Sequence, residues 1–184
     1  MASSSVRKTF AFIDASNIIY GTRDEEWKVD FKKLFKYLKE RYECRKIYYF
    51  AGKDEKNEKQ EKFYKKLELF GYDLILKKVK IYVQNGHKIK KANCDVDLTF
   101  YAMRDLNLFN RVVFLSGDGD FEILLKHFLV LKKEIIVMAN GKRTAREIRQ
   151  LVGENFTELK SIKKIIEFEN KKRQTLRTNL PHVL

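Results

Sequence analysis

Aspartates directly follow apolar runs at two distant places in this sequence. The run VVFLSGDGD changes from apolar residues to two glycines that alternate with Asp118 and Asp120. Asp14 follows the run FAFI in the same way. If both runs are parallel strands, their carboxyl ends lie at the same edge of a sheet, where ligands bind in such folds. We therefore expect these carboxylates to lie close together.

A third acidic segment, CDVDL, contains Asp95 and Asp97 and precedes a helical pattern. Its acids join the same edge if that helix begins there, as the helix of a parallel crossover does. Residues two apart point to opposite sides of a helix. We therefore expect Asp95 to be the ligand and Asp97 to have a secondary role.

Such a cluster of acids is costly without a partner. Two carboxylates about 4 Å apart repel by roughly 4 kcal/mol at an effective dielectric constant near 20. A shared proton or a bound cation removes this cost, and a set of carboxylate oxygen ligands favours Mg²⁺ or Mn²⁺ over Zn²⁺. The expected ligands are Asp14, Asp95, Asp118 and Asp120, and the expected supporting residues are Asn17, Asp97 and Ser116.

Each acid taken singly has an ordinary structural explanation. Asp14 suits a turn, Asp95 an N-cap, and Asp118 and Asp120 a capping loop before Phe121. Capping explains neither the Asp-Gly-Asp pair nor the recurrence of acids at one predicted edge.

Short runs rich in β-formers predict the strands of the sheet that positions these acids. Helical patterns separate the runs, for example Phe31, Leu34 and Leu38 after a capping Asp30. This repeated alternation predicts an α/β fold in which helices cover both faces of a parallel sheet. The predicted strands are residues 9–13, 46–50, 72–76, 111–115 and 134–138.

Residues 77–91 interrupt this alternation. Asn85-Gly86 lies between two alternating segments, as in a tight hairpin, and predicts a projecting β-ribbon. The segment between Asp73 and Asp95 contains no acid, so its lysines suit a clamp for a nucleic-acid backbone, and its tyrosine suits base stacking. The alternative is a solvated edge hairpin whose lysines block aggregation. The residues expected to bind nucleic acid here are Lys77, Lys78, Lys80, Tyr82, Lys88, Lys90 and Lys91.

A second basic stretch, ANGKRTAREIRQ, follows the last clear predicted strand. Lys142, Arg143 and Arg146 are expected to hold a further phosphate, with the two arginines on adjacent helical positions.

The length and charge of the chain set the wider limits. Its 184 residues suit one domain, here 1–160, followed by a basic, partly mobile extension, 161–184. Its formal charge of +14 favours a polyanionic partner, although solvated lysine-rich helix faces explain the charge equally well. Nowhere do 18 apolar residues run together, so we expect no membrane span and a cytoplasmic location.

Three motifs, IDASN, CDVDL and LSGDGDFEILL, occur in this order and are separated by βα units. Together they resemble the NYN domain, especially its LabA-type branch, over residues 8–158. That family belongs to the PIN-like nuclease superfamily. The resemblance implies a Rossmann-like, three-layer α/β/α sandwich whose acidic pocket binds Mg²⁺ or Mn²⁺ and cuts RNA phosphodiesters. The family's acids carry over onto Asp14, Asp95, Asp118 and Asp120.

The sequence departs from the family pattern at Tyr101, where many relatives have a further aspartate. Asp97 lies one helical turn earlier on the same face and could replace it. The favoured interpretation is an endoribonuclease for RNA that is single-stranded or has unpaired regions, and a homodimer is left open. The alternative is an RNA-binding module with weak or no catalysis. A third, more distant interpretation is a topoisomerase-primase-type magnesium site, but its first strand would lead with a glutamate, and this chain has Asp14.

Overall fold

The computed structural model describes residues 7–84 and 87–169, without the side chains of residues 81–91. It has a six-stranded sheet in the order β3-β2-β1-β6-β7-β8 and a separate two-stranded sheet, β4-β5. The strands are β1 (Thr9–Asp14), β2 (Cys44–Lys53), β3 (Asp73–Lys78), β4 (Lys80–Gln84), β5 (His87–Lys91), β6 (Arg111–Leu115), β7 (Glu134–Ala139) and β8 (Phe156–Glu158).

Helices connect and cover these strands. The α-helices are α1 (Ala15–Arg23), α2 (Phe31–Tyr42), α3 (Glu58–Phe70), α4 (Asp95–Arg104), α5 (Glu122–Val130), α6 (Arg146–Val152) and α7 (Lys163–Ile166). The 3-10 helices are η1 (Leu106–Leu108), η2 (Gly119–Phe121), η3 (Gly141–Arg143), η4 (Gly153–Asn155) and η5 (Leu159–Ile162).

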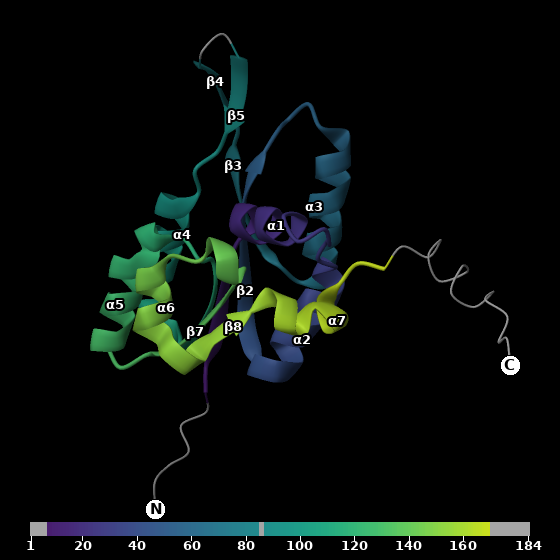
Figure 1. Ribbon diagram of the computed structural model, residues 1–184. Coiled ribbons are helices and arrows are strands. Elements are labelled where there is room, and N and C mark those ends of the chain that lie inside the picture. The colour runs from purple at the N-terminus through teal and green to yellow at the C-terminus, as the bar shows by residue number, and fades with distance from the viewer. Residues whose placement is uncertain (1–6, 85–86, 170–184) are drawn as a thin grey trace, which may run out of the picture.

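All pairings within the six-stranded sheet are parallel, which confirms the predicted α/β class. Helices α1, α2, α3 and α7 lie on one side of the sheet, and α4, α5 and α6 lie on the other (Figure 1). The fold is therefore a three-layer α/β/α sandwich. In β1, successive side chains alternate between the two sides, so Ala11 and Ile13 join one buried cluster and Phe10 and Phe12 join the other.

Local signals in the sequence explain where several helices begin and end. Asp30 caps α2 by accepting hydrogen bonds from the backbone N–H groups of Lys32 and Lys33. Gly71 ends α3 at φ 102°, a left-handed conformation that glycine adopts readily. Both ends agree with the sequence pattern.

The order in which the chain adds strands reverses between β1 and β6, at the centre of the sheet. The chain builds β2 and β3 on one side of β1 and later builds β6, β7 and β8 on the other. In open α/β sheets, the crevice outside the carboxyl ends of the strands at such a reversal is the usual ligand site. Here that position lies beyond the ends of β1 and β6.

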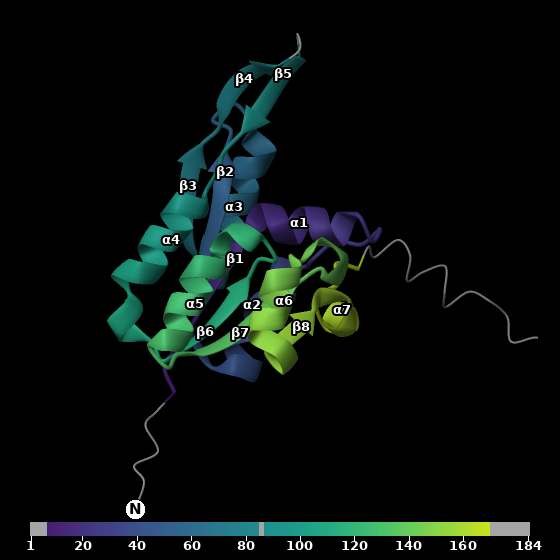
Figure 2. The same cartoon turned by 60° about the vertical axis from the view of Figure 1, so that its left-hand side comes forward.

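The projecting hairpin is shorter than predicted. Lys77 and Lys78 belong to β3 and pair with Gly52 and Lys53 of β2, so they lie in the central sheet. The hairpin consists of β4 and β5, which extend away from the body of the molecule (Figure 2). Its predicted turn, Asn85-Gly86, lies outside the described residues.

Two further details differ from the sequence expectation. Arg143 and Arg146 do not share a helix, because Thr144 is extended, Ala145 is not helical, and the two residues separate η3 from α6. The sequence pattern does not predict the edge strand β8, since its three residues are too few to show an alternation. Helix α7 contributes buried Ile166 to the core on the side of α2, and residues 170–184 lie outside the described part of the chain.

Candidate active site

The site begins where β1 and β6 end beside each other. Ile13 of β1 pairs with Leu115 of β6, which places the next residues, Asp14 and Ser116, side by side. Ser116 Oγ donates a hydrogen bond to Asp14 Oδ2 at 3.1 Å. Residues 102 positions apart in sequence therefore meet at one point of the sheet edge.

Asp14 is held firmly in a half-buried position. It is the N-cap of α1, and its Oδ1 accepts hydrogen bonds from the backbone N–H groups of Ser16 and Asn17 at 3.0 and 3.2 Å. Burial raises the pKa of Asp14; the charge of Asp95 acts in the same direction, while the hydrogen bonds oppose the shift. The carboxylate is thus oriented but poorly hydrated, so a nearby cation would stabilise its charged form.

The SGDGD loop is folded by its own polar side chains. The backbone N–H of Asp118 donates to Ser116 Oγ at 3.3 Å, and the N–H of Asp120 donates to Asp118 Oδ1 at 3.1 Å. Gly117 N–H donates to Asn17 Oδ1 at 3.2 Å, so the Asn17 side chain fixes this loop. A Cβ atom at Gly117 would lie 2.5 Å from Thr144 Oγ1, which explains the glycine.

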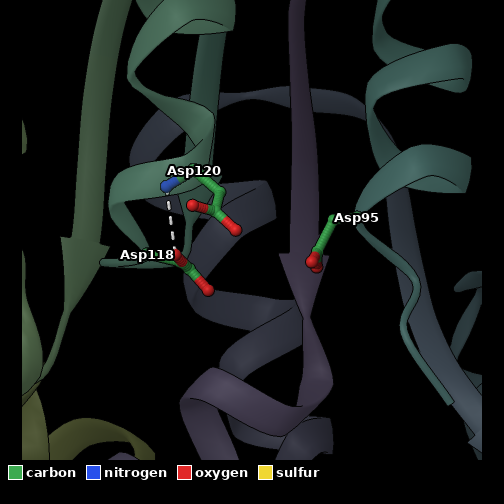
Figure 3. A group of neighbouring side chains, drawn as sticks. All are labelled: Asp95, Asp118 and Asp120. Atoms are coloured by element: carbon green, nitrogen blue, oxygen red, sulfur yellow. Dashed lines mark hydrogen bonds between the residues drawn. The ribbon is translucent and has the colours of Figure 1, made fainter.

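Three of the predicted acids converge. Asp95 is the first residue of α4, and its backbone N–H donates to Asn93 Oδ1 at 2.8 Å. One carboxylate oxygen each of Asp95, Asp118 and Asp120 lie within 4.8 Å of one another. Figure 3 shows the side chains approaching from α4 and from the SGDGD loop, with the end of β1 between them.

These acids and Asp14 line one pocket of about 420 Å³. Ser16, Asn17 and Tyr20 of α1 form another part of its wall, and Arg143 also reaches it. The remaining lining residues are Ala92, Asn93 and Cys94. All four acids expected to act together therefore face the same space.

Asp97 stands apart from this group. Its Oδ2 forms an ion pair with Nζ of Lys77, near the end of β3, at a distance of 2.6 Å. The two acids of CDVDL diverge, as their spacing on a helix predicts. Tyr101 lies one turn further along α4, where its ring contacts those of Tyr48 and Phe50 and belongs to the packing of the core.

The predicted basic residues lie in several different settings. Lys78 pairs with Glu55 at 2.8 Å, and Arg143 Nη1 contacts Asp24 Oδ2 at 2.8 Å. Lys80, Lys142 and Arg146 are exposed. The side chains of Tyr82, Lys88, Lys90 and Lys91 lie outside the described residues.

Sequence reasoning missed Tyr20 as a wall of the pocket. The available signal was its spacing, because Asn17 and Tyr20 are three residues apart on a helix capped by Asp14. Tyr20 reaches the pocket only because of where α1 lies relative to the SGDGD loop, and the sequence alone does not predict that position.

This protein is a three-layer α/β/α sandwich with a parallel sheet, and its acids lie beyond the carboxyl ends of the central strands. Residues 8–160 match the family model of the NYN domain. The chain therefore belongs to the NYN domain family, within the PIN-like nuclease superfamily.

Comparison with individual proteins gives one distant relative by sequence and one structural neighbour. The chain is 26% identical over 161 residues to the "Low amplitude and bright protein LabA" of Synechococcus elongatus, covering 85% of this chain and 86% of that protein. A crystal structure of a protein of unknown function from Vibrio parahaemolyticus superposes with a TM-score of 0.75 at 22% identity. That match covers 91% of this chain and 100% of the other, and it shows a shared fold.

Within the described residues, none of the helices is both long and apolar enough to cross a membrane.

Proposed function

We propose that this protein is a metal-dependent endoribonuclease that hydrolyses RNA phosphodiester bonds at the acidic pocket. The observation that carries the proposal is the convergence of Asp95, Asp118 and Asp120 within 4.8 Å, with Asp14 lining the same pocket. Membership of the NYN family supports this reaction class, and the net charge of +14 supports a polyanionic substrate.

The donor set fits Mg²⁺ or Mn²⁺. Its ligating atoms are carboxylate oxygens, which these hard cations prefer. Asp95, Asp118 and Asp120 would hold the ion, with Asp14 as a further ligand. A bound divalent ion supplies positive charge for the phosphate and makes a water molecule more acidic.

The protein's own contribution is to hold these groups in place. Ser116 fixes one oxygen of Asp14, and the N-terminus of α1 fixes the other. Asn17 anchors the loop that carries Asp118. A preorganised set of carboxylates loses little orientational freedom when a cation and a phosphate arrive.

Arg143 is well placed to contact the substrate backbone. Arg143 lines the pocket, its guanidinium pairs with Asp24, and both side chains remain about half exposed. An exposed ion pair of this kind contributes only about 0 to 1 kcal/mol, and a guanidinium has five N–H donors. Arg143 can therefore bind a phosphate oxygen without a large loss of stability.

Purified protein incubated with RNA tests the proposal. We expect cleavage with Mg²⁺ or Mn²⁺, none in EDTA, and a loss on the order of 100-fold or more in Asp118→Asn, since even outer-shell changes at metal sites cost about 10- to 100-fold. Asparagine keeps the capping hydrogen bond to Asp120. The matched control Glu40→Gln, on the exposed face of α2, should cleave normally. Cleavage that persists in EDTA or in Asp118→Asn would contradict the proposal.

The second candidate is an RNA-binding module without catalysis. Two observations favour it: Tyr101 occupies a position that is often acidic in the family, and Asp97, the expected substitute, pairs with Lys77. RNA binding by the wild-type protein without cleavage under any of the metal conditions would select this candidate.

A further inference from the structure

We infer that Tyr20 is a base-stacking residue that makes the acidic pocket selective for unpaired nucleotides. The inference rests on the proposed function for its choice of RNA, but its test does not require cleavage. Tyr20 lies on α1, lines the same pocket as Asp14 and Asp118, and is 46% exposed.

Location distinguishes this tyrosine from other exposed apolar side chains. Single exposed hydrophobic residues are common and need no functional explanation. Tyr20, however, follows Asn17 by three residues on α1, so both side chains lie on the helix face that borders the acids. A nucleotide whose phosphate lies at the carboxylates would have its neighbouring base within reach of this wall.

Arg23 prepares the ring for stacking. The Arg23 guanidinium carbon lies 5.1 Å from the centre of the Tyr20 ring, a cation–π contact that restricts the ring's orientation. A ring that is held in place loses less side-chain entropy when a base stacks on it. The same arginine places a positive charge against the ring of Tyr20, which lines the pocket.

Arg143 supplies a positive group in the lining of this pocket. Tyr20 can hold a base, Arg143 can hold a phosphate oxygen, and the carboxylates lie in the same lining. Contacts to phosphate position a strand but do not distinguish paired from unpaired RNA. An aromatic ring distinguishes unpaired from paired RNA, because bases within a duplex already stack on their neighbours and offer no free face.

The test measures binding in Ca²⁺, a divalent ion with oxygen ligands, so that it is separate from catalysis. The probes are a short unstructured oligoribonucleotide carrying 2-aminopurine at one position at a time and the same strand in a duplex. The variants are Tyr20→Leu, which removes the ring, and Tyr20→Phe, which keeps it. Phe100→Leu, 60% exposed on α4 and outside the pocket lining, is the matched control.

We expect Tyr20→Leu to bind the single strand about 5- to 150-fold more weakly, the range found for loss of one stacked base. Tyr20→Phe and Phe100→Leu should bind it as the wild type does. At one probe position, 2-aminopurine fluorescence should be quenched on binding by the wild type and by Tyr20→Phe, and much less by Tyr20→Leu. Binding to the duplex should be the same for all variants.

Equal affinity of Tyr20→Leu and the wild type for the single strand would overturn the inference, even if the protein cleaves RNA. An equal loss of affinity for the duplex would overturn it as well. Stacking by the wild type without cleavage in Mg²⁺ or Mn²⁺ would contradict the proposed function and support the inference. Failure of the wild type to bind either probe would contradict both.

Discussion

Helix α4 has an aspartate at each end, and the two carboxylates lie in opposite environments. Asp105, at its carboxyl end, is buried and accepts hydrogen bonds from the Tyr48 hydroxyl and from Arg104 Nε, the latter at 2.7 Å. Asp95, at its amino end, lies within 4.8 Å of Asp118 and Asp120. Asp105 pairs with Arg104 inside the fold, and Asp95 lies with two further acids at the pocket.

The helix dipole sharpens this contrast. A negative charge is unfavourable at the carboxyl end of a helix and favourable at the amino end. Asp105 therefore needs the pairing with Arg104, which holds its pKa below the usual range. Asp95 gains some stabilisation from the helix, but the repulsion among neighbouring carboxylates opposes it. We interpret Asp105 as an acid that stabilises the fold and Asp95 as an acid that serves the site.

The same substitution at the two ends of α4 should have different consequences for cleavage. In Asp95→Asn we expect RNA cleavage to fall on the order of 100-fold, because the pocket loses a ligand. In Asp105→Asn we expect the cleavage rate per folded molecule to stay near that of the wild type. Both rates should be measured under single-turnover conditions, with the folded fraction determined by circular dichroism. Equal losses in the two variants would break the comparison.

Stability should respond in the reverse order. Asp105→Asn should lower the free energy of unfolding by about 1.5 to 3 kcal/mol, the usual contribution of hydrogen bonds to a buried charged group. Asp95→Asn should lower it much less, since the substitution also relieves repulsion from Asp118 and Asp120. Urea unfolding without divalent ions measures both. A destabilised Asp95→Asn beside an unaffected Asp105→Asn would reverse our assignment of the two roles.

The contribution of Asp105 should disappear in acid. Its pKa is lowered in the folded protein, mainly by the hydrogen bond from Arg104. Its stabilising effect is therefore complete above the unfolded pKa, about 3.9 for Asp, and is lost as pH falls through the lower folded value. The stability difference between wild type and Asp105→Asn should be constant from pH 7 to about pH 5 and shrink below about pH 4. A difference that grows on acidification would contradict this pairing.

Much of the acidic site could be predicted because it depends on strand ends. Asp14 and Asp118 each follow a strong apolar run, and parallel strands bring their ends to one edge. The Asp-Gly-Asp spacing added the local signal of a tight polar loop. These features are local in sequence, and the parallel direction of the strands brings them to the same edge of the sheet.

The details that could not be predicted depend on contacts between distant elements. The pairing of Lys77 with Asp97 requires the end of β3 to lie beside the first turn of α4, and no local pattern states this. The break between Arg143 and Arg146 arises where Thr144 packs against Gly117 of another loop. Tyr20 lines the pocket because α1 lies beside the SGDGD loop, and this arrangement also depends on distant elements.

The binding of Mn²⁺ to the RNA-free protein tests the central claim most directly. Titration followed by electron paramagnetic resonance reports the free ion, so it is independent of cleavage. We predict that the wild type and Asp105→Asn bind Mn²⁺ alike and that Asp118→Asn binds it at least about 10-fold more weakly. Equal Mn²⁺ affinity of Asp118→Asn and the wild type would contradict the account.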